Sequence, residues 1–253
     1  MTNERTPLND RSAFEALTAS INDRNAQKAN SRTVRICYGG GCLASGACEL
    51  RHALTEAAER NGVTVDIQPS GCMGPCAVGP VLAVDPENVF YEGVRPEDAA
   101  EIIEKHIIGG TPVPRLLHRN RADGEIAAVS DDVDFFEPQT KIVLRNCGTV
   151  DPEEIESALA HGAYRGLVSV VTESQPDAVV QTVLDAGLRG RGGAGFPTGK
   201  KWRATAEADG DIKYVLCNAD EGDPGAFMDR SVLEGDPHTL IEGMAIAAYA
   251  VGA

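Results

Sequence analysis

The spacing of apolar residues predicts a small α/β unit in the first half of the chain. Short apolar runs predict strands at 34–38, 63–67, 80–85 and 88–94, the last two forming a hairpin. Helical spacing predicts helices at 46–60 and 96–108, and Pro96 is a typical first residue for the second. The predicted order is β-α-β-β-β-α, which is about the size of one domain.

The second half of the chain is predicted to contain both strands and helices. Strands are expected at 141–146 and, in a buried position, at 213–217; helices are expected at about 151–161, 176–188, 200–208 and 236–253. A polar segment precedes both halves, and within it Phe14, Leu17 and Ile21 suggest a short amphipathic helix. The stretch 109–138 mixes Gly, Pro and charge, which is typical of an interdomain connection, and His118 is expected on its solvated surface.

These patterns give an α/β fold class and a division into four segments. We expect an N-terminal extension at 1–31, a first domain at 32–117, a linker at 118–138 and a second domain at 139–253.

Composition favours a globular, cytoplasmic protein. Hydrophobic residues make up 42% of the chain, enough for a core, and the formal net charge of −15 argues against binding to nucleic acid or to an anionic membrane face. The N-terminus lacks the pattern of a signal peptide, and no apolar run approaches the roughly 20 residues that span a bilayer. In a reducing compartment, the seven cysteines are expected as ligands or buried thiols rather than as disulfides.

Four of these cysteines are grouped near predicted strand ends. Cys37 and Cys42 form C-x4-C, and Cys72 and Cys76 form C-x3-C after another 29 residues. Four thiolates suit a [2Fe–2S] cluster or a structural zinc. The neighbouring glycines favour the cluster because their N–H groups can donate to sulfur, and the C-x2-C pairs usual for zinc are absent, but zinc remains open. Cys48 fits an inert, buried thiol.

The run 187–202, GLRGRGGAGFPTGKKW, is a cationic, glycine-rich stretch in an acidic chain. No Asp or Glu occurs from 186 to 206, where five Lys and Arg side chains fall. Glycines at 190, 192, 193, 195 and 199 leave backbone N–H groups accessible to a flat, anionic ligand, and a helix starting at Lys200 adds partial positive charge. The run contains G-x-G-x-x-G, but the preceding segment is a predicted helix rather than a strand, so a simple Rossmann loop is disfavoured; Ala194 breaks the phosphate-loop pattern.

A second polar loop, NADEGDPG at 218–225, follows the predicted strand at 213–217. Its side-chain oxygens suit ribityl or ribose hydroxyls at the carboxyl end of a strand. A metal site is disfavoured, because the calcium-loop spacing is not met and no histidine is near. A capped turn without ligand remains the structural alternative.

The segment from Arg32 to Leu117, with CYGGGCLASGAC and SGCMGPCAVGP, resembles the thioredoxin-like [2Fe–2S] ferredoxin domain. That domain occurs in the small flavin-associated subunit of respiratory complex I and at the N-terminus of related hydrogenase subunits. The resemblance implies that Cys37, Cys42, Cys72 and Cys76 are the cluster ligands.

Residues 139–253 are similar to the flavin- and NADH-binding subunit of complex I and to diaphorase subunits of NAD(P)-linked hydrogenases and formate dehydrogenases. The glycine run, YVLCNADEGDPGAFMDR and LEGDPHTLIEGMAIAAYAVGA carry this similarity. It implies sites for FMN and NAD(P)H built by Gly190, Arg191, Gly192, Gly193, Gly195, Phe196, Lys201, Asn218, Asp220, Glu221 and Asp223. In it Lys201 contacts FMN, Phe196 stacks on the adenine, and Glu221 lies near the nicotinamide as the catalytic-site residue. Asp223 replaces a frequent Glu and Ala204 an aromatic, which leaves NADH or NADPH preference open.

The resemblances imply an NAD(P)H-oxidising subunit of the NADH dehydrogenase (quinone) or hydrogenase diaphorase type. Hydride would pass from NAD(P)H to FMN, and single electrons would pass to iron–sulfur clusters and to other subunits of a multisubunit redox complex, which can be peripheral to the inner membrane. The family's flavin domain continues with further FMN contacts and a [4Fe–4S] domain, so we expect this chain to be C-terminally truncated and that cluster to lie outside it. The alternative is a ferredoxin-like electron carrier without hydride chemistry.

Overall fold

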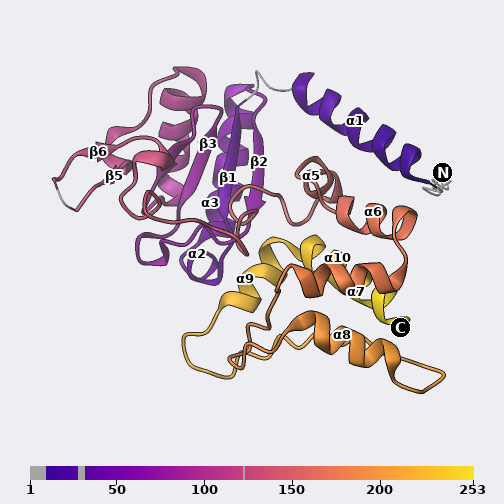
Figure 1. Cartoon of the computed structure of the whole chain (residues 1–253). Helices are drawn as coiled ribbons and strands as arrows, with labels where there is room; N and C mark the ends of the chain where they lie inside the picture. Colours follow the sequence, from indigo (N-terminus) through magenta and orange to yellow (C-terminus); the bar gives the residue numbers. More distant parts are fainter. Residues whose placement is uncertain (1–9, 28–31, 122) are drawn as a thin grey trace. The chain divides into compact units, whose positions relative to one another are not determined.

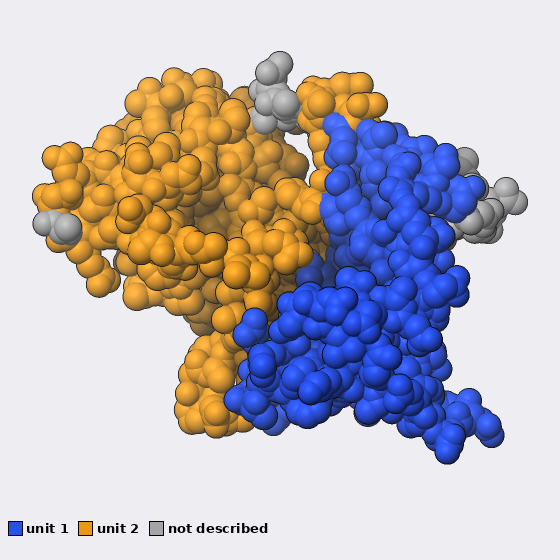
Figure 2. Space-filling model, viewed as in Figure 1, with its two compact units in different colours: residues 1–22, 162–220, 238–253 blue, residues 23–161, 221–237 orange. Residues whose placement is uncertain are grey.

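The computed structural model describes residues 10–27, 32–121 and 123–253. Part of the expected N-terminal extension, 1–9 and 28–31, lies outside these residues. The chain divides into two compact units, coloured separately in Figure 2. Unit 1 contains 1–22, 162–220 and 238–253, and unit 2 contains 23–161 and 221–237. No helix in the described ranges has the length and apolar character needed to cross a membrane.

Unit 2 is built on one mixed sheet of four strands (Figure 1). The strands are β1 (Thr33–Cys37), β2 (Asp66–Ser70), β3 (Leu82–Asp85) and β4 (Val89–Tyr91), in the order β2-β1-β3-β4. Strand β1 pairs parallel with β2 and antiparallel with β3, and β3 pairs antiparallel with β4. The predicted order β-α-β-β-β-α is confirmed.

The helices of this domain cover the sheet with their apolar stripes. Helix α3 (Ala47–Asn61) buries Leu50, Leu54 and Ala57, and the short α2 (Gly40–Ala44), which the sequence analysis missed, precedes it. Strand β2 begins three residues later than predicted, because α3 ends at Gly62 with φ 64° and the next residues return the chain to the sheet. The predicted helix at 96–108 is present as a 3₁₀ turn (Pro96–Asp98), α4 (Ala99–Glu101) and a wide π-helical segment (Ile102–Ile108).

The glycine- and proline-rich stretch after this helix packs into the domain core, so the expectation of a solvated connection is wrong. It forms a 3₁₀ turn (Pro114–Leu116), β5 (His118–Arg119), β6 (Ile126–Ala127) and another 3₁₀ turn (Ser130–Asp132). Val113, Leu116 and Val133 are buried in the core of the sheet domain, and single bridges join this stretch to β4. The segment therefore covers β4, which would otherwise be an open edge.

His118 is buried rather than solvated as expected. Its Nδ1 lies 2.7 Å from a Glu92 oxygen and its Nε2 lies 2.9 Å from an Asp134 oxygen. Burial disfavours the charged ring, but the hydrogen bonds to both carboxylates outweigh that cost and raise the pKa of His118.

The remainder of unit 2 is irregular or helical. The predicted strand at 141–146 is wrong: the segment forms consecutive turns, and Ile142 is 74% exposed. A strand needs a hydrogen-bonded neighbouring strand, and no described strand pairs with the segment 141–146. Helix α5 (Ile155–Ala160) is shorter than predicted, and α9 (Met228–Gly235), absent from the predictions, packs in this unit.

Unit 1 is helical in its described part. Most of α1 (Arg11–Gln27) belongs to it and buries Phe14 and Ile21, as predicted; the other helices are α6 (Arg165–Glu173), α7 (Pro176–Asp185), α8 (Thr198–Glu207) and α10 (Pro237–Val251). Val179 and Val180 of α7 pack with Ala250 and Tyr249 of α10. The buried strand predicted at 213–217 is wrong, because the segment pairs with no described strand and Leu216 is 87% exposed.

Candidate functional site

The structure brings the four predicted cysteines together in unit 2. Cys37 ends β1, Cys42 lies in α2, and Cys72 and Cys76 lie in the loop after β2. The thiol of Cys37 shifts the pKa of both Cys42 and Cys72, and the thiols of Cys72 and Cys76 affect each other in the same way, so the four side chains are neighbours. The Met73 N–H also donates to Cys37 Sγ at 3.4 Å. The β1–α2 segment and the loop after β2 thus gather four thiols into one cluster, as the spacing predicted, although their role as ligands remains a prediction.

The thiols differ in burial and in acidity. Cys37 and Cys42 are buried, while Cys76 is exposed. The hydrogen bond with Cys42 raises the pKa of Cys37 to about 11, and the same bond lowers the pKa of Cys42. The hydrogen bond with Cys37, together with burial, raises the pKa of Cys72. Binding an iron–sulfur cluster requires thiolates, so cluster uptake here must release protons.

Glycines let the backbone approach the cysteine sulfurs. A Cβ at Gly39 would lie 2.9 Å from Cys72 Sγ, and one at Gly79 would lie 2.9 Å from Cys42 Sγ. A Cβ at Gly41 would lie 3.7 Å from Cys76 Sγ. Within the described ranges, no three His, Cys, Asp or Glu side chains are placed to hold a single metal ion. The four-thiol donor set, closely lined by backbone, fits an iron–sulfur cluster.

Two further cysteines of unit 2, Cys48 and Cys147, differ in their burial. Cys48 is exposed on α3, so the expectation of a buried thiol is wrong. Cys147 is buried, and its Sγ lies 3.5 Å from the Ser231 carbonyl oxygen of α9. Burial raises the pKa of Cys147 to about 11, which is consistent with an unreactive packing thiol.

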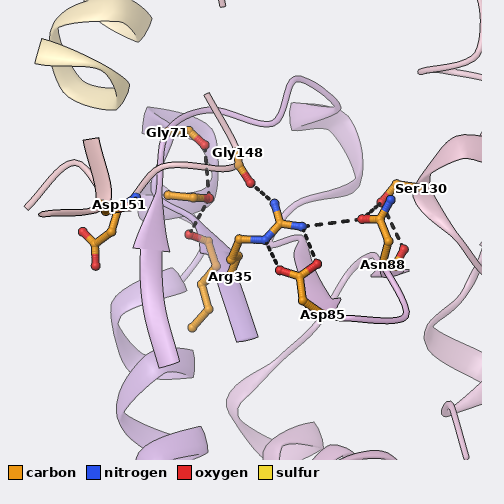
Figure 3. Close-up of polar contacts among 10 residues, drawn as sticks. Arg35, Gly71, Asp85, Asn88, Ser130, Gly148 and Asp151 are labelled. Atoms are coloured by element: carbon orange, nitrogen blue, oxygen red, sulfur yellow. Dashed lines mark hydrogen bonds and ion pairs between the residues drawn. The ribbon is translucent and has the colours of Figure 1, made fainter. Parts of the chain in front are cut away.

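An arginine that the sequence analysis did not single out, Arg35, binds the backbone at Gly148 (Figure 3). Arg35, on β1, forms a two-pronged ion pair with Asp85 at 2.6 and 2.9 Å and donates to the Gly148 carbonyl oxygen. Gly148 has φ 90°, and a Cβ there would lie 3.1 Å from Met73 Cγ. Arg35 therefore holds residues 147–148 against the loop that carries Cys72. A lone Arg within a strand gives no sequence signal for such a role.

In unit 1, the glycine-rich run forms a closed but accessible loop. The Gly190 N–H donates to the Phe196 carbonyl at 2.9 Å, and the Thr198 N–H donates to Leu188 at 2.9 Å. A Cβ at Gly192, Gly193 or Gly195 would meet nothing within 4 Å. In the described part of the chain, the N–H groups of 191–196 donate to no protein acceptor. The loop offers the free donors and open space that the sequence predicted.

Residues around this loop divide into accessible and structural positions. Phe196 is 55% exposed, and Lys201 and Arg191 are exposed. Gly199, in contrast, is buried, and its Cβ would lie 2.6 Å from Leu184 Cγ. Gly199 thus serves the packing of α8 on α7, not a ligand, which corrects its inclusion in the open run. Helix α8 begins at Thr198 and directs its free N–H end toward the loop, as expected.

The predicted loop 218–225 is divided between the two units. In unit 1, the Asp220 N–H donates to Asn218 Oδ1 at 3.0 Å, which forms a local turn. In unit 2, the Glu221 carboxylate accepts from the N–H groups of Asp229 and Arg230 at 2.7 and 3.0 Å, while Asp223 is exposed. Glu221 therefore caps α9, as the capped-turn alternative held, and its role at a nicotinamide remains a prediction.

Comparison with known families matches both halves of the chain. Residues 22–106 match the family model described as thioredoxin-like [2Fe-2S] ferredoxin, and residues 183–253 match the one described as Nuo51 FMN-binding domain. The descriptions of these two models name FMN and [2Fe-2S], which confirms the resemblance drawn from the motifs and disfavours the zinc alternative.

Named relatives are of two kinds. The chain is 56% identical over 115 residues to NADP-reducing hydrogenase subunit HndC of Solidesulfovibrio fructosivorans, covering 46% of this chain and 23% of the relative. It is 51% identical over 119 residues to one of the NADH-quinone oxidoreductase subunits of Rhizobium meliloti (strain 1021), covering 47% and 28%. With NAD-reducing hydrogenase HoxS subunit alpha of Cupriavidus necator it shares 35% identity over 185 residues, covering 72% and 28%. The chain thus spans only 23 to 28% of the length of these relatives.

Solved structures are similar as well. A thioredoxin-like [2Fe–2S] ferredoxin from Aquifex aeolicus is 37% identical, covers 35% of this chain and 90% of its own, and has a TM-score of 0.32. An NAD⁺-reducing [NiFe]-hydrogenase in the H₂-reduced state is 26% identical, covers 98% and 42%, and has a TM-score of 0.35.

Proposed function

We propose that this chain is the cluster-bearing and nucleotide-binding part of an NAD(P)H-oxidising subunit. The single observation that carries the proposal is the combination, in one chain, of four gathered thiols in unit 2 and an open glycine loop in unit 1. The family matches and the named NADH- and NAD(P)-linked relatives support it.

Flavin, when bound, accepts a hydride from the nicotinamide and releases single electrons. The protein's part is to bind and orient. The free N–H groups of 191–196 and the start of α8 receive phosphate, and the Lys201 ammonium offsets its charge. The exposed ring of Phe196 offers a stacking surface for the adenine. Because hydride transfer between stacked rings needs no general base, positioning is the main contribution of these residues.

In unit 2, the four cysteines would hold the [2Fe–2S] cluster as thiolates, and the neighbouring glycines let the backbone lie close to their sulfurs. We propose other subunits of a multisubunit redox complex as partners, with a quinone, hydrogenase or formate dehydrogenase component as final acceptor. The proposed location is the cytoplasm, with attachment at the inner membrane through these partners.

The test uses the 253-residue chain reconstituted with iron, sulfide and FMN, then mixed with NADH or NADPH without oxygen. Bleaching of the flavin absorption, followed by the spectrum of a reduced [2Fe–2S] cluster, is the expected result. Bound flavin that neither nicotinamide bleaches would refute hydride chemistry in this chain.

Two variants with matched loss of charge localise the flavin site. Lys201→Ala is expected to weaken FMN binding, because it removes a cation beside the open loop. Lys105→Ala removes a cation in unit 2, where Lys105 pairs with Glu101 at 2.7 Å, and is expected to leave FMN binding unchanged. Equal FMN affinity in both variants would contradict the assigned loop.

A second candidate is an electron carrier that holds the cluster but no flavin. The observation that favours it is that unit 2 contains all four thiols. In unit 1, the segment 213–217, which was predicted to lead into a ligand loop as a buried strand, is exposed and forms no strand. A [2Fe–2S] spectrum without retained FMN in the same reconstitution would support this candidate.

A further inference from the structure

Helix α9 makes close contacts at both of its ends within unit 2. At its N-terminal end, the Asp229 and Arg230 N–H groups donate to the Glu221 carboxylate. At its C-terminal end, Gly235 approaches the cluster loop so closely that a Cβ at Gly71 would lie 2.6 Å from Gly235 Cα. The segment 221–237, which lies in the second half of the sequence, is thereby fixed beside the cysteine loop of the first half.

A cavity of about 310 Å³ lies between α9 and the cysteine loops. Gly39, Gly40, Cys72 and Cys76 line it from the cluster side, and Phe227 and Arg230 line it from the α9 side. The guanidinium carbon of Arg230 lies 3.4 Å from the position that a Cβ would take on Gly40. The guanidinium therefore lies against the first residue of α2, the helix that carries Cys42.

A second charge on α9 opposes this cation. Glu234 Oε1 lies 2.8 Å from Arg230 Nε, and both side chains are about half exposed, at 45% and 52%. An exposed pair of this kind contributes little to stability. The electrostatic effect of the Arg230–Glu234 pair on a neighbouring anion does not follow from its small contribution to stability. That effect depends on the distance of each of the two charges from the anion.

We propose that α9 covers the cysteine cluster and that Arg230 raises the reduction potential of the group held there, while Glu234 partly offsets it. This inference rests on the proposed function only in requiring a [2Fe–2S] cluster on the four cysteines. A cluster with four thiolates is an anion and gains one negative charge on reduction, so a nearby cation stabilises the reduced state more than the oxidised one. Nearby charge and solvent exposure are among the means by which proteins set such potentials.

The experiment measures the midpoint potential of the reconstituted full chain by redox titration followed by electron paramagnetic resonance. Arg230→Gln is expected to make reduction about tenfold less favourable, a shift of about −59 mV for one electron. Glu234→Gln is expected to shift the potential in the opposite, positive direction. Arg60→Gln, which removes an exposed cation from the end of α3, is the matched control and is expected to leave the potential unchanged.

Ionic strength gives a further readout that packing alone would not change. Because Arg230 is half exposed, raising the salt from 0.1 to 1 M, where the screening length falls from about 10 to about 3 Å, is expected to shrink both shifts. Urea unfolding of each variant checks that the fold is retained.

The outcomes separate this inference from the proposed function. Equal potentials in all four proteins, or shifts of the same sign for Arg230→Gln and Glu234→Gln, would overturn the electrostatic role of Arg230 alone. Failure of the unmodified chain to form a [2Fe–2S] spectrum would overturn the cluster assignment and this inference with it.

Discussion

The close approach of Gly71 to Gly235 predicts what happens when one methyl group is added there. In Gly71→Ala, the new Cβ would lie 2.6 Å from Gly235 Cα and 3.2 Å from Cys147 Cα. Carbon atoms pack best at about 3.5–4.0 Å, so the first contact is roughly 1 Å too short, and it involves backbone that cannot rotate away. Either the cysteine loop or α9 must move.

The structure indicates that α9 moves. Gly235 is the one α9 residue that the described structure buries, whereas the cysteine loop continues directly from β2 of the sheet. Overpacking of this kind costs about 1–3 kcal/mol. If this cost falls on α9, its local opening becomes more favourable by between about fivefold and about 150-fold, while the sheet keeps its stability.

Amide hydrogen exchange of residues 228–235, read beside that of β1 and β3, measures this effect. Exchange in Gly71→Ala is expected to be faster in α9 and unchanged in the strands. Gly243→Ala is the control, because its Cβ would meet nothing within 4 Å and a helical Ala stabilises by up to about 1 kcal/mol. Unchanged α9 exchange in Gly71→Ala would refute the docking described here.

Three further predictions test individual residues. Gly199→Ala is expected to lower the free energy of unfolding of unit 1 by about 1–3 kcal/mol, because the new Cβ would meet Leu184 of α7. Gly192→Ala is expected to leave stability unchanged and to weaken FMN binding, since its Cβ would enter the open loop. Denaturation measures the first effect and flavin titration the second. Since the pKa of His118 is raised in the folded state, its stabilisation is complete below about pH 6.5 and is lost as the pH rises through the raised value, so urea unfolding at pH 6 and 9 should differ more in the parent than in His118→Asn. Cys72→Ser is expected to lose cluster iron and Cys48→Ser to retain it, and retention by both would contradict the ligand assignment.

The sequence was most informative where local pattern and tertiary packing agree. Alternating apolar runs predicted the four-stranded sheet domain, and cysteine spacing predicted the thiol cluster, because strand ends fix where adjacent loops lie. The segments 141–146 and 213–217 have the composition of strands, but strand formation depends on a partner that local composition does not reveal.

Other features escaped prediction because their signal is not local. Val113 and Val133 lie among glycines, prolines and charges, yet they are buried against β4. Helix α9 buries almost nothing apolar, and its place depends on Gly71 and Gly235, which are far apart in sequence. The role of Arg35 depends in the same way on the distant residues Asp85 and Gly148.

The segment 221–237 belongs to unit 2, although the segments on both sides of it belong to unit 1. Separating the two halves of the chain therefore also divides unit 2. A cut after His161, where the first stretch of unit 2 ends, would separate α9 from the sheet domain. In the intact chain the folded segment 162–220 links α9 covalently to the rest of unit 2, so α9 docks intramolecularly. Residues 23–161 alone would lack this helix unless it were added in trans, and as a free fragment they would differ from the same sequence within the whole chain.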